Sequence, residues 1–283
     1  MKCKLCSSDR FKYREGEVRD AKGLKILECE ECSLVYLSSV DHIDEEFYES
    51  SNMHKEVDFL KWQNDTKADD ERRFEFMESM ITNRSVLDFG SGNGGFLLRA
   101  REVAKEVVGV ELEKAVIPHY EAKGLALYDD LESIDKKFDY ITAFHVIEHL
   151  KNPEVILKKM ATLLSDGGKI ILEVPNSQDA LLSLYENEAF SKFTYWSCHL
   201  YLYNQHTLSL LAKKASLKVD FIKHIQRYPL SNHLYWLSKN RAGGHTKWGK
   251  FLDSDALNSA YEAQLASIGA TDTIIAMVSK DVL

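Results

Sequence analysis

One segment of the chain, Val86 to Leu97, constrains the fold more than any other. It is an apolar run that stops at an acid, turns through closely spaced glycines and resumes with helix formers. This order is typical of a strand, a tight loop and the start of a helix. A second apolar run, Val107 to Val110, follows and ends at Glu111. The two runs predict neighbouring strands of an α/β sheet with a nucleotide site at the glycine loop.

The loop has the residues that a bound adenosine needs. Glycine lacks Cβ and lets the backbone come within contact distance of a ligand. A carboxylate at Glu111 can accept hydrogen bonds from both hydroxyls of a ribose. The other residues expected around the cofactor here are Gly90, Ser91, Gly92, Gly94 and Leu112. These features predict a cofactor that contains adenosine.

The acid before the loop bears on which cofactor this is. Gly90, Gly92 and Gly95 also fit the G-x-G-x-x-G pattern, so the loop alone does not separate a nicotinamide or flavin cofactor from S-adenosylmethionine. Asp88 precedes the first glycine by two residues, where the pyrophosphate of a dinucleotide would be repelled. S-adenosylmethionine has no pyrophosphate and presents a cationic methionyl end. We therefore expect S-adenosylmethionine, with Asp88 among its contacts.

With these residues the chain resembles the class I S-adenosylmethionine-dependent methyltransferases. Asp129 and Asp130 follow a short apolar run, where the family has an acid near the adenine amino group. Phe138 to Leu150 is similar to the family's fourth strand and the turn beneath the methionine moiety. The resemblance implies that Phe144 and His145 contact the cofactor.

The same resemblance implies the fold. Residues 166 to 176 are similar to the family's fifth strand and the turn before it. The family has a Rossmann-like α/β fold with a seven-stranded sheet whose last strand is antiparallel. Thr273 to Val278 is the expected last strand, at the edge of the sheet, after a helix at Thr207 to Ala215 and a strand at Leu217 to Arg227.

A second pattern, at the N-terminus, indicates a metal. Two C-x₂-C pairs, Cys3 with Cys6 and Cys29 with Cys32, are separated by 22 residues. This spacing suits one tetrahedral Zn²⁺, and the four thiolates leave no position for water. The sequence therefore predicts a structural zinc ribbon, with strands at residues 11–18 and 24–27, rather than disulfides or a catalytic metal.

We divide the chain into three parts on this basis. Residues 1–40 form the zinc ribbon, and 41–82 form a lid or linker of two helices, in which Trp62 or Arg73 is a candidate cofactor contact. Residues 83–283 form the methyltransferase core, with insertions at 180–205 and 230–270 on the substrate side. The first insertion is rich in aromatic residues, which could line a substrate pocket. In the second, Gly243 and Gly244 could hold a phosphate or carboxylate.

Methyl transfer needs a group that takes the acceptor's proton, and histidines are the candidates. They are His145, His149 and His199. The chain also resembles sugar C-methyltransferases that have the same cysteine domain and a downstream Y-x-E-H segment whose histidine is the base. His199 matches that histidine, but Trp196 and Cys198 replace the tyrosine and glutamate. This resemblance favours methylation of a sugar hydroxyl, free or nucleotide-linked, with His199 as base.

A metal-assisted reaction is the alternative for the same residues. Some O-methyltransferases bind a divalent metal through a pattern like E-x-x-E-H and a later histidine. Here His145, Glu148, His149 and His199 give a comparable set, in which a metal could lower the pKa of the acceptor. Glu148 and His149 could equally pack and cap the following helix.

Composition limits the partners. The net charge of −8 repels polyanions, so the sequence does not favour an RNA or DNA substrate, although an RNA methyltransferase stays an alternative. Apolar runs are shorter than the about 20 residues that span a bilayer, and we expect a cytoplasmic enzyme with a small-molecule acceptor. The non-enzymatic alternative is a scaffold that binds the cofactor and uses the ribbon as an interaction module.

Overall fold

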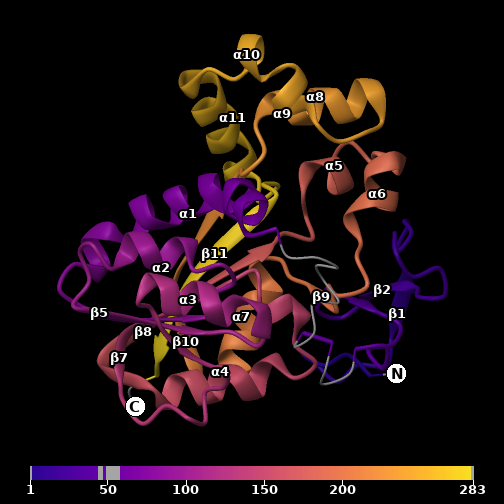
Figure 1. Ribbon diagram of the computed structural model, residues 1–283. Helices are drawn as coiled ribbons and strands as arrows, with labels where there is room; N and C mark the ends of the chain where they lie inside the picture. The colour runs from indigo at the N-terminus through magenta and orange to yellow at the C-terminus, as the bar shows by residue number, and fades with distance from the viewer. Residues whose placement is uncertain (1, 44–46, 49–57, 282–283) are drawn as a thin grey trace.

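Seven strands form one mixed sheet in the computed structural model, which describes residues 2–43, 47–48 and 58–281 (Figure 1). In sheet order they are β10 (Leu217–Ile225), β11 (Thr273–Lys280), β8 (Leu164–Pro175), β7 (Phe138–Phe144), β4 (Ser85–Phe89), β5 (Glu106–Val110) and β6 (Ala126–Tyr128). Neighbours are parallel except at β11, which is antiparallel to both β8 and β10. The predicted Rossmann-like α/β fold with an antiparallel last strand is confirmed.

The expected position of that last strand at the sheet edge is wrong. β11 lies between β8 and β10, and β10 is the edge strand. Both faces of β11 are buried: Ile274 and Ile275 point to opposite faces, and neither is exposed. An unbroken apolar strand of this kind is typical of the interior of a sheet that is covered on both sides.

Helices cover both faces of the sheet. Successive strand residues point to opposite sides, so Val86 packs with one helical layer and Leu87 with the other. The first layer holds α1 (Phe59–Ile81), α2 (Gly95–Ala100), η1 (Lys114–Val116) and α3 (Ile117–Lys123). The second holds α4 (Pro153–Thr162) and α7 (Gln205–Lys214). The short helix η2 (Ile147–His149) follows β7.

The predicted insertions contain further elements. The first contains α5 (Ala180–Ser183), α6 (Glu188–Thr194) and β9 (Tyr201–Leu202). The second contains α8 (Leu230–Lys239), α9 (Gly244–Lys247), α10 (Gly249–Leu252) and α11 (Asp255–Ser267), which gather at one end of the molecule (Figure 1). Of the two helices predicted before the core, the second is α1, and most of the first lies outside the described residues. Among the helices of the described ranges, none has both the length and the apolar character needed to cross a membrane.

The N-terminal residues form a small antiparallel sheet that is joined to the core. Its order is β1 (Phe11–Tyr13), β2 (Ile26–Cys29), β3 (Val35–Leu37) and β9. The fourth strand therefore comes from the first insertion, 164 residues after the end of β3. Buried side chains of the ribbon, such as Val35, belong to the same apolar cluster as Leu87 of the central sheet. The ribbon thus packs as part of the main core.

A buried acid at the start of α5 gives a stability prediction. Burial, reinforced by the charge of Asp272, raises the pKa of Asp179 to about 8. The folded chain therefore keeps a proton that the unfolded chain loses, and stability falls as the pH rises from about 4 to about 8. In the wild type, Asp179 accepts a hydrogen bond from the amide of Leu181 at 2.7 Å. An asparagine at this position cannot ionise, but its side-chain oxygen can accept the same hydrogen bond.

We expect Asp179→Asn to raise the free energy of unfolding at pH 8 by about 1 kcal/mol or more. The gain should shrink towards pH 4 in urea titrations. Asp166→Asn, at an exposed position near the start of β8, is the control and should show no such trend. A gain that did not change with pH would contradict a protonated Asp179.

Candidate functional site

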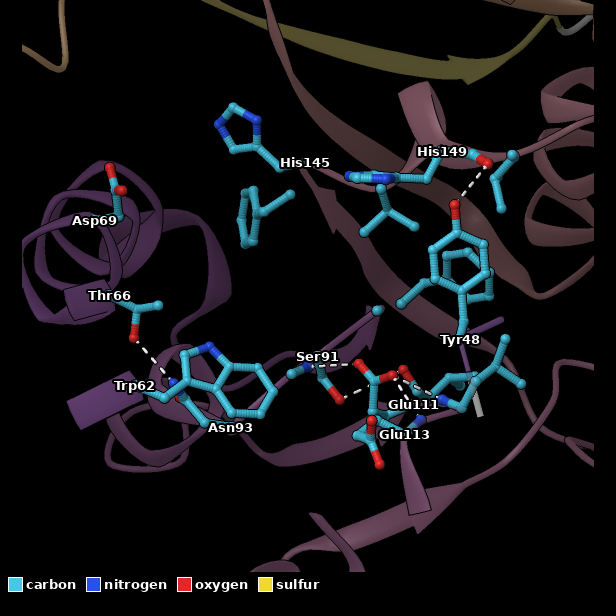
Figure 2. A pocket seen from close by; sticks show the side chains of 18 of the residues that line it. Tyr48, Trp62, Thr66, Asp69, Ser91, Asn93, Glu111, Glu113, His145 and His149 are labelled. Carbon is cyan, nitrogen blue, oxygen red and sulfur yellow. Dashed lines mark hydrogen bonds between the residues drawn. The ribbon is translucent and has the colours of Figure 1, made fainter. Parts of the chain in front are cut away.

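A cavity of about 490 Å³ lies at the carboxyl ends of the central strands, under α1 (Figure 2). Figure 2 shows His145 and His149 on one side of it and Glu111 with Glu113 on the other. The residues that sequence reasoning assigned to the site and that line the cavity are Gly90, Ser91, Gly92, Glu111, Leu112, Phe144, His145, His149 and His199. Trp62 and Arg73 of α1 also line it. The carboxyl ends of strands are where ligands bind in open α/β sheets.

The glycine loop passes close to its neighbours. Gly90 has a φ of +72°, and a Cβ there would lie 2.4 Å from Cγ2 of Val146. Gly92 has a φ of +52°, and a Cβ there would lie 3.1 Å from Cζ2 of Trp62. Residues with a side chain rarely adopt this backbone conformation, and at Gly90 they would also clash. The loop therefore keeps its backbone against the cavity, as a cofactor site requires.

Glu111 organises the loop as well as facing the cavity. Its Oε2 accepts the amide of Gly92 at 2.8 Å, and its Oε1 accepts those of Leu112 at 2.8 Å and Glu113 at 3.0 Å. Each carboxylate oxygen has about two acceptor positions. Oε1 is filled, and Oε2 retains one position, so one ribose hydroxyl could bind Glu111 without displacing an amide. Binding of both hydroxyls needs one amide to move.

Four residues expected at the cofactor do not line the cavity. Asp88 is buried, accepts a hydrogen bond from Thr142 at 2.6 Å and has its pKa raised to about 7 by burial. Gly94 precedes α2 and faces the core. Asp129 and Asp130 are exposed, and Asp130 accepts hydrogen bonds from Ser133. The argument that Asp88 faces the cationic end of the cofactor therefore has no support in this geometry.

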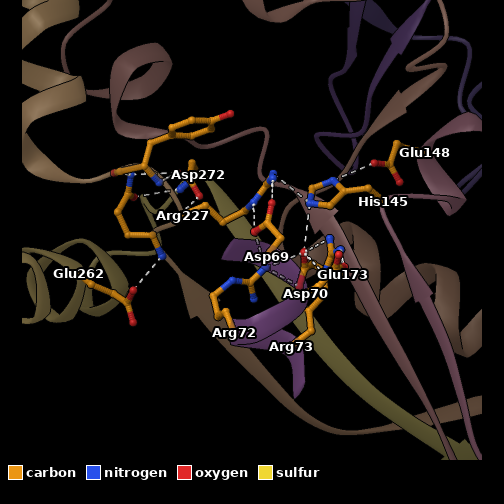
Figure 3. A network of polar contacts seen from close by, with 12 residues as sticks. Asp69, Asp70, Arg72, Arg73, His145, Glu148, Glu173, Arg227, Glu262 and Asp272 are labelled. Atoms are coloured by element: carbon orange, nitrogen blue, oxygen red, sulfur yellow. Dashed lines mark hydrogen bonds and ion pairs between the residues drawn. The ribbon is translucent and has the colours of Figure 1, made fainter. Parts of the chain in front are cut away.

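A partly buried network of charges, centred on the buried Glu173, closes one wall of the cavity (Figure 3). Arg227, which follows the edge strand β10, donates to both oxygens of Asp69 on α1. Glu173 of β8 accepts from Arg72 at 2.9 Å and from Arg73 at 2.7 Å. These pairs fix α1 over the carboxyl ends of the strands. Coulombic attraction to Arg227 outweighs burial and lowers the pKa of Asp69, which stays ionised.

The network holds His145 through both of its ring nitrogens. Its Nδ1 lies 3.2 Å from Glu148, and its Nε2 lies 3.2 Å from Glu173 and 3.1 Å from Arg227. Burial and Arg227 lower its pKa, but the two carboxylates outweigh them and leave the pKa raised. Both ring nitrogens have polar partners, so His145 links the turn after β7 to β8 and to Arg227. Its φ of +55° is unusual for a residue with a side chain.

His149 and His199 form a second cluster, on the side away from α1. Their ring centroids are 4.8 Å apart, and both line the cavity. Burial and the neighbouring His149 lower the pKa of His199 to about 3, so its imidazole is neutral. Glu148 lies behind them and does not line the cavity. Its Oε2 and the Nδ1 of His149 are buried without a hydrogen-bond partner in the described part of the chain.

Sequence reasoning missed several polar residues of the cavity, among them Arg227, Asp69 and Thr66. Arg227 follows a strand that the sequence predicts, so its place at the carboxyl end of β10 was a usable signal. Asp69 and Thr66 lie on α1, and no sequence pattern places them at the cavity, because their position there depends on how α1 packs against the sheet. Thr66 accepts a hydrogen bond from Asn93 of the loop at 3.0 Å.

The four cysteines of the ribbon fit a zinc ion. All four sulfurs lie within 4.8 Å of one another, with Cys3 and Cys32 at 3.6 Å and Cys6 and Cys29 at 3.4 Å. A tetrahedron with Zn–S bonds of 2.3 Å has edges of about 3.8 Å. Two equivalent turns present the pairs: Ser7 donates to the carbonyl of Cys3 and Ser33 to that of Cys29, both at 2.9 Å. This donor set suits a structural Zn²⁺.

The second insertion does not bring its glycines to the cavity. Gly244 packs against the α8 backbone, where a Cβ would lie 2.3 Å from the carbonyl oxygen of Ser231. Arg241 donates to the hydroxyl of Tyr235 at 3.2 Å. Neither glycine of the pair lines the cavity, so the phosphate site suggested for this turn has no support in the geometry.

Known proteins are similar to part of this chain. Residues 54–220 match the family described as methyltransferase domain. A ubiquinone biosynthesis O-methyltransferase of Coxiella burnetii is 31% identical over 119 residues, which are 37% of this chain and 50% of that protein. A tRNA U34 carboxymethyltransferase of Desulforapulum autotrophicum is 29% identical over 125 residues, 40% of this chain and 38% of that protein. The chain thus spans about half the length, or less, of these two curated relatives.

A solved structure has the same fold. The S-adenosylmethionine-dependent methyltransferase from Archaeoglobus fulgidus aligns with a TM-score of 0.52 and 18% identity, covering 79% of this chain and all of that one. At this identity the likeness concerns the fold alone. Because the family match covers more than half of the chain, the protein belongs to the methyltransferase family and contains a class I S-adenosylmethionine-dependent methyltransferase domain.

Proposed function

We propose that this chain transfers the methyl group of S-adenosylmethionine to a hydroxyl of a small polar acceptor, a free or nucleotide-linked sugar, with His199 as the base. The observation that carries the proposal is that one cavity is lined both by the glycine loop with Glu111 and by the partly buried pair His149 and His199. The cofactor supplies an electrophilic methyl group. The protein must orient the acceptor and remove its proton.

The properties of His199 suit a base. A neutral imidazole can accept a proton, and burial keeps His199 neutral well below neutral pH. Of the other two candidates, His145 has both nitrogens occupied. His149 lies next to His199 and is only slightly exposed, which suits a role in orienting it.

The walls near His199 suit a small ring. Tyr48, Trp196 and Phe47 line this part of the cavity, and Trp196 lies 5.7 Å from His199 between ring centroids. Aromatic walls with a few polar groups are typical of small-molecule sites. The apolar face of a sugar ring could pack on such a wall while a hydroxyl approaches His199.

The test is a screen for methyl transfer. The purified protein is incubated with S-adenosylmethionine and a panel of nucleotide sugars and simple glycosides, and S-adenosylhomocysteine and methylated products are measured by mass spectrometry. We expect a product 14 mass units heavier for at least one sugar. Binding of S-adenosylhomocysteine without transfer to any hydroxyl compound would favour the scaffold alternative.

A second candidate, metal-assisted O-methylation, is favoured by one observation. Ligand atoms of His149, Cys198 and His199 lie within 4.8 Å of one another, and Glu148 adds a buried oxygen without a partner in the described residues. The sequence predicted His145 as a ligand of this metal, but Cys198 takes its place in the cluster, because His145 contacts Glu173 and Arg227 instead. Metal analysis separates the candidates: two metals per chain, falling to one in His149→Ala, would favour the second, and one metal in both would favour the first.

A further inference from the structure

The residues of the acceptor side lie on a segment that the ribbon holds. This segment, Tyr195 to Tyr203, is called the strap below; it follows α6 and contains Trp196, His199 and β9. On one side it lies against the ribbon, and on the other against η2 and the turn after β8. Trp196 and His199 line the cavity from the strap.

Ribbon residues bind the strap on both sides of Trp196. The amide of Arg19 donates to the carbonyl of Tyr195 at 3.0 Å. Asp20 accepts the amide of Ser197 at 2.9 Å and its hydroxyl at 2.8 Å. The guanidinium of Arg19 lies 4.6 Å from the Trp196 ring centroid. The backbone on both sides of Trp196, and its ring, are thus fixed by two consecutive ribbon residues.

The end of the strap is bound to the metal-binding turn. Cys29 ends β2 and Cys32 lies just before β3, so a zinc ion would fix the turn between these strands. β3 in turn pairs with β9 of the strap, and Leu37 donates to the carbonyl of Leu200 at 3.1 Å. His199 immediately precedes Leu200. The path from the metal site to His199 thus runs from Cys32 along β3 to Leu37, across one hydrogen bond to Leu200, and back one residue to His199.

The cofactor side of the cavity does not depend on these contacts. The glycine loop is held by Val110 and Glu111 of the neighbouring strand: Gly90 donates to the carbonyl of Val110 at 2.8 Å, and Gly92 to Glu111. Thr66 of α1 holds the loop through Asn93. These partners all belong to the sheet and α1. The two sides of one cavity therefore have different supports.

We propose that the metal-loaded ribbon positions the acceptor side of the cavity, with Asp20 as the positioning residue that fixes the strap. Loss of the metal or of Asp20 frees Trp196 and His199, while the glycine loop and Glu111 still bind the cofactor. This rests on the proposed function only in treating Trp196 and His199 as the acceptor side. Its test measures the strap itself, so it can fail or succeed whatever the acceptor is.

The test compares Asp20→Ala with Asp41→Ala by hydrogen exchange and mass spectrometry. Asp41 is an exposed acid that directly follows the ribbon, and its carboxylate accepts a hydrogen bond from the hydroxyl of Ser39. Asp20→Ala removes two hydrogen bonds to a charged group, so we expect exchange in residues 195–203 to rise about tenfold or more. We expect unchanged exchange in residues 86–97, zinc content and affinity for S-adenosylhomocysteine. Asp41→Ala should match the wild type, and Asp20→Asn should restore part of the protection.

Removal of zinc by a chelator should have the same selective effect. We expect faster exchange in the strap and faster alkylation of Cys198, which is 1% exposed in the intact fold, with S-adenosylhomocysteine still bound. Unchanged exchange of the strap in Asp20→Ala would overturn the proposal. So would an equal loss of cofactor affinity, or unfolding of the whole chain without zinc, because the ribbon would then support both sides alike.

Discussion

Replacing Glu111 with alanine is expected to lower the affinity for S-adenosylhomocysteine by about 100-fold, a loss of about 2.7 kcal/mol. The carboxylate accepts three backbone amides, including that of Gly92 in the loop, and faces the cavity with one acceptor position left. Alanine removes the bond to the ribose and the support of the loop together. Isothermal titration of both proteins measures the effect.

Glu106→Ala is the matched control for this experiment. Glu106 is the first residue of β5, and Glu111 directly follows the last. Glu106 therefore lies at the amino end of this strand, away from the cavity, where it pairs with Lys136. We expect wild-type affinity for this variant. Thermal melting without ligand shows whether Glu111→Ala is folded. Wild-type affinity in a folded Glu111→Ala protein would mean that the adenosine binds elsewhere in the cavity.

The sequence predicted the glycine-loop side of the cavity better than the side that holds the histidines. The loop, Glu111 and the strands around them are close in the chain, and their order carries a strong local pattern. Asp88 shows where the pattern misleads: the motif places an acid before the loop, but its side chain turns into the core and bonds Thr142. Which way a side chain points at a strand end depends on the register of neighbouring strands, which a local pattern does not contain.

The side of the cavity that holds the histidines depends on contacts between distant segments. His145, Glu173 and Arg227 meet in one network although they come from three different strand ends. Glu148 is close to His145 in the sequence, but Glu173 and Arg227, which also contact the His145 ring, could not be inferred from the spacing of the histidines. The position of β9 was likewise unpredictable, because two residues paired with a remote strand leave no periodic signal.

The network also explains how α1 is held over the cavity. Arg227 joins the edge strand to Asp69 of α1, and Glu173 joins the same helix to the sheet through Arg72 and Arg73. If one partner of such a pair is removed, the charge of the other partner stays without compensation, and the fold loses stability. The helix is thus held over the cavity by charge, and the two sides of the cavity can differ in how they are supported.

His199→Ala is expected to lower the rate of methyl transfer by about 10²- to 10⁴-fold, the usual contribution of a general base. Affinity for S-adenosylhomocysteine should stay at the wild-type value, because His199 lies among the acceptor-side residues. His206→Ala, on the exposed first turn of α7, is the matched control and should keep full activity. Equal rates for His199→Ala and the wild type on the acceptor found in the screen would exclude His199 as the base.

The pH dependence of stability tests the state of His199 without an acceptor. Burial lowers its pKa to about 3, against about 6.5 in the unfolded chain. Between these values the unfolded chain binds a proton that the folded chain does not, so stability falls as the pH falls. His199→Ala lacks this effect. The wild type's advantage in free energy of unfolding over His199→Ala should therefore shrink from pH 7 to pH 4, by at most about 1.4 kcal/mol per pH unit. An advantage that grew towards acid pH would mean that His199 is charged in the fold and cannot accept the proton.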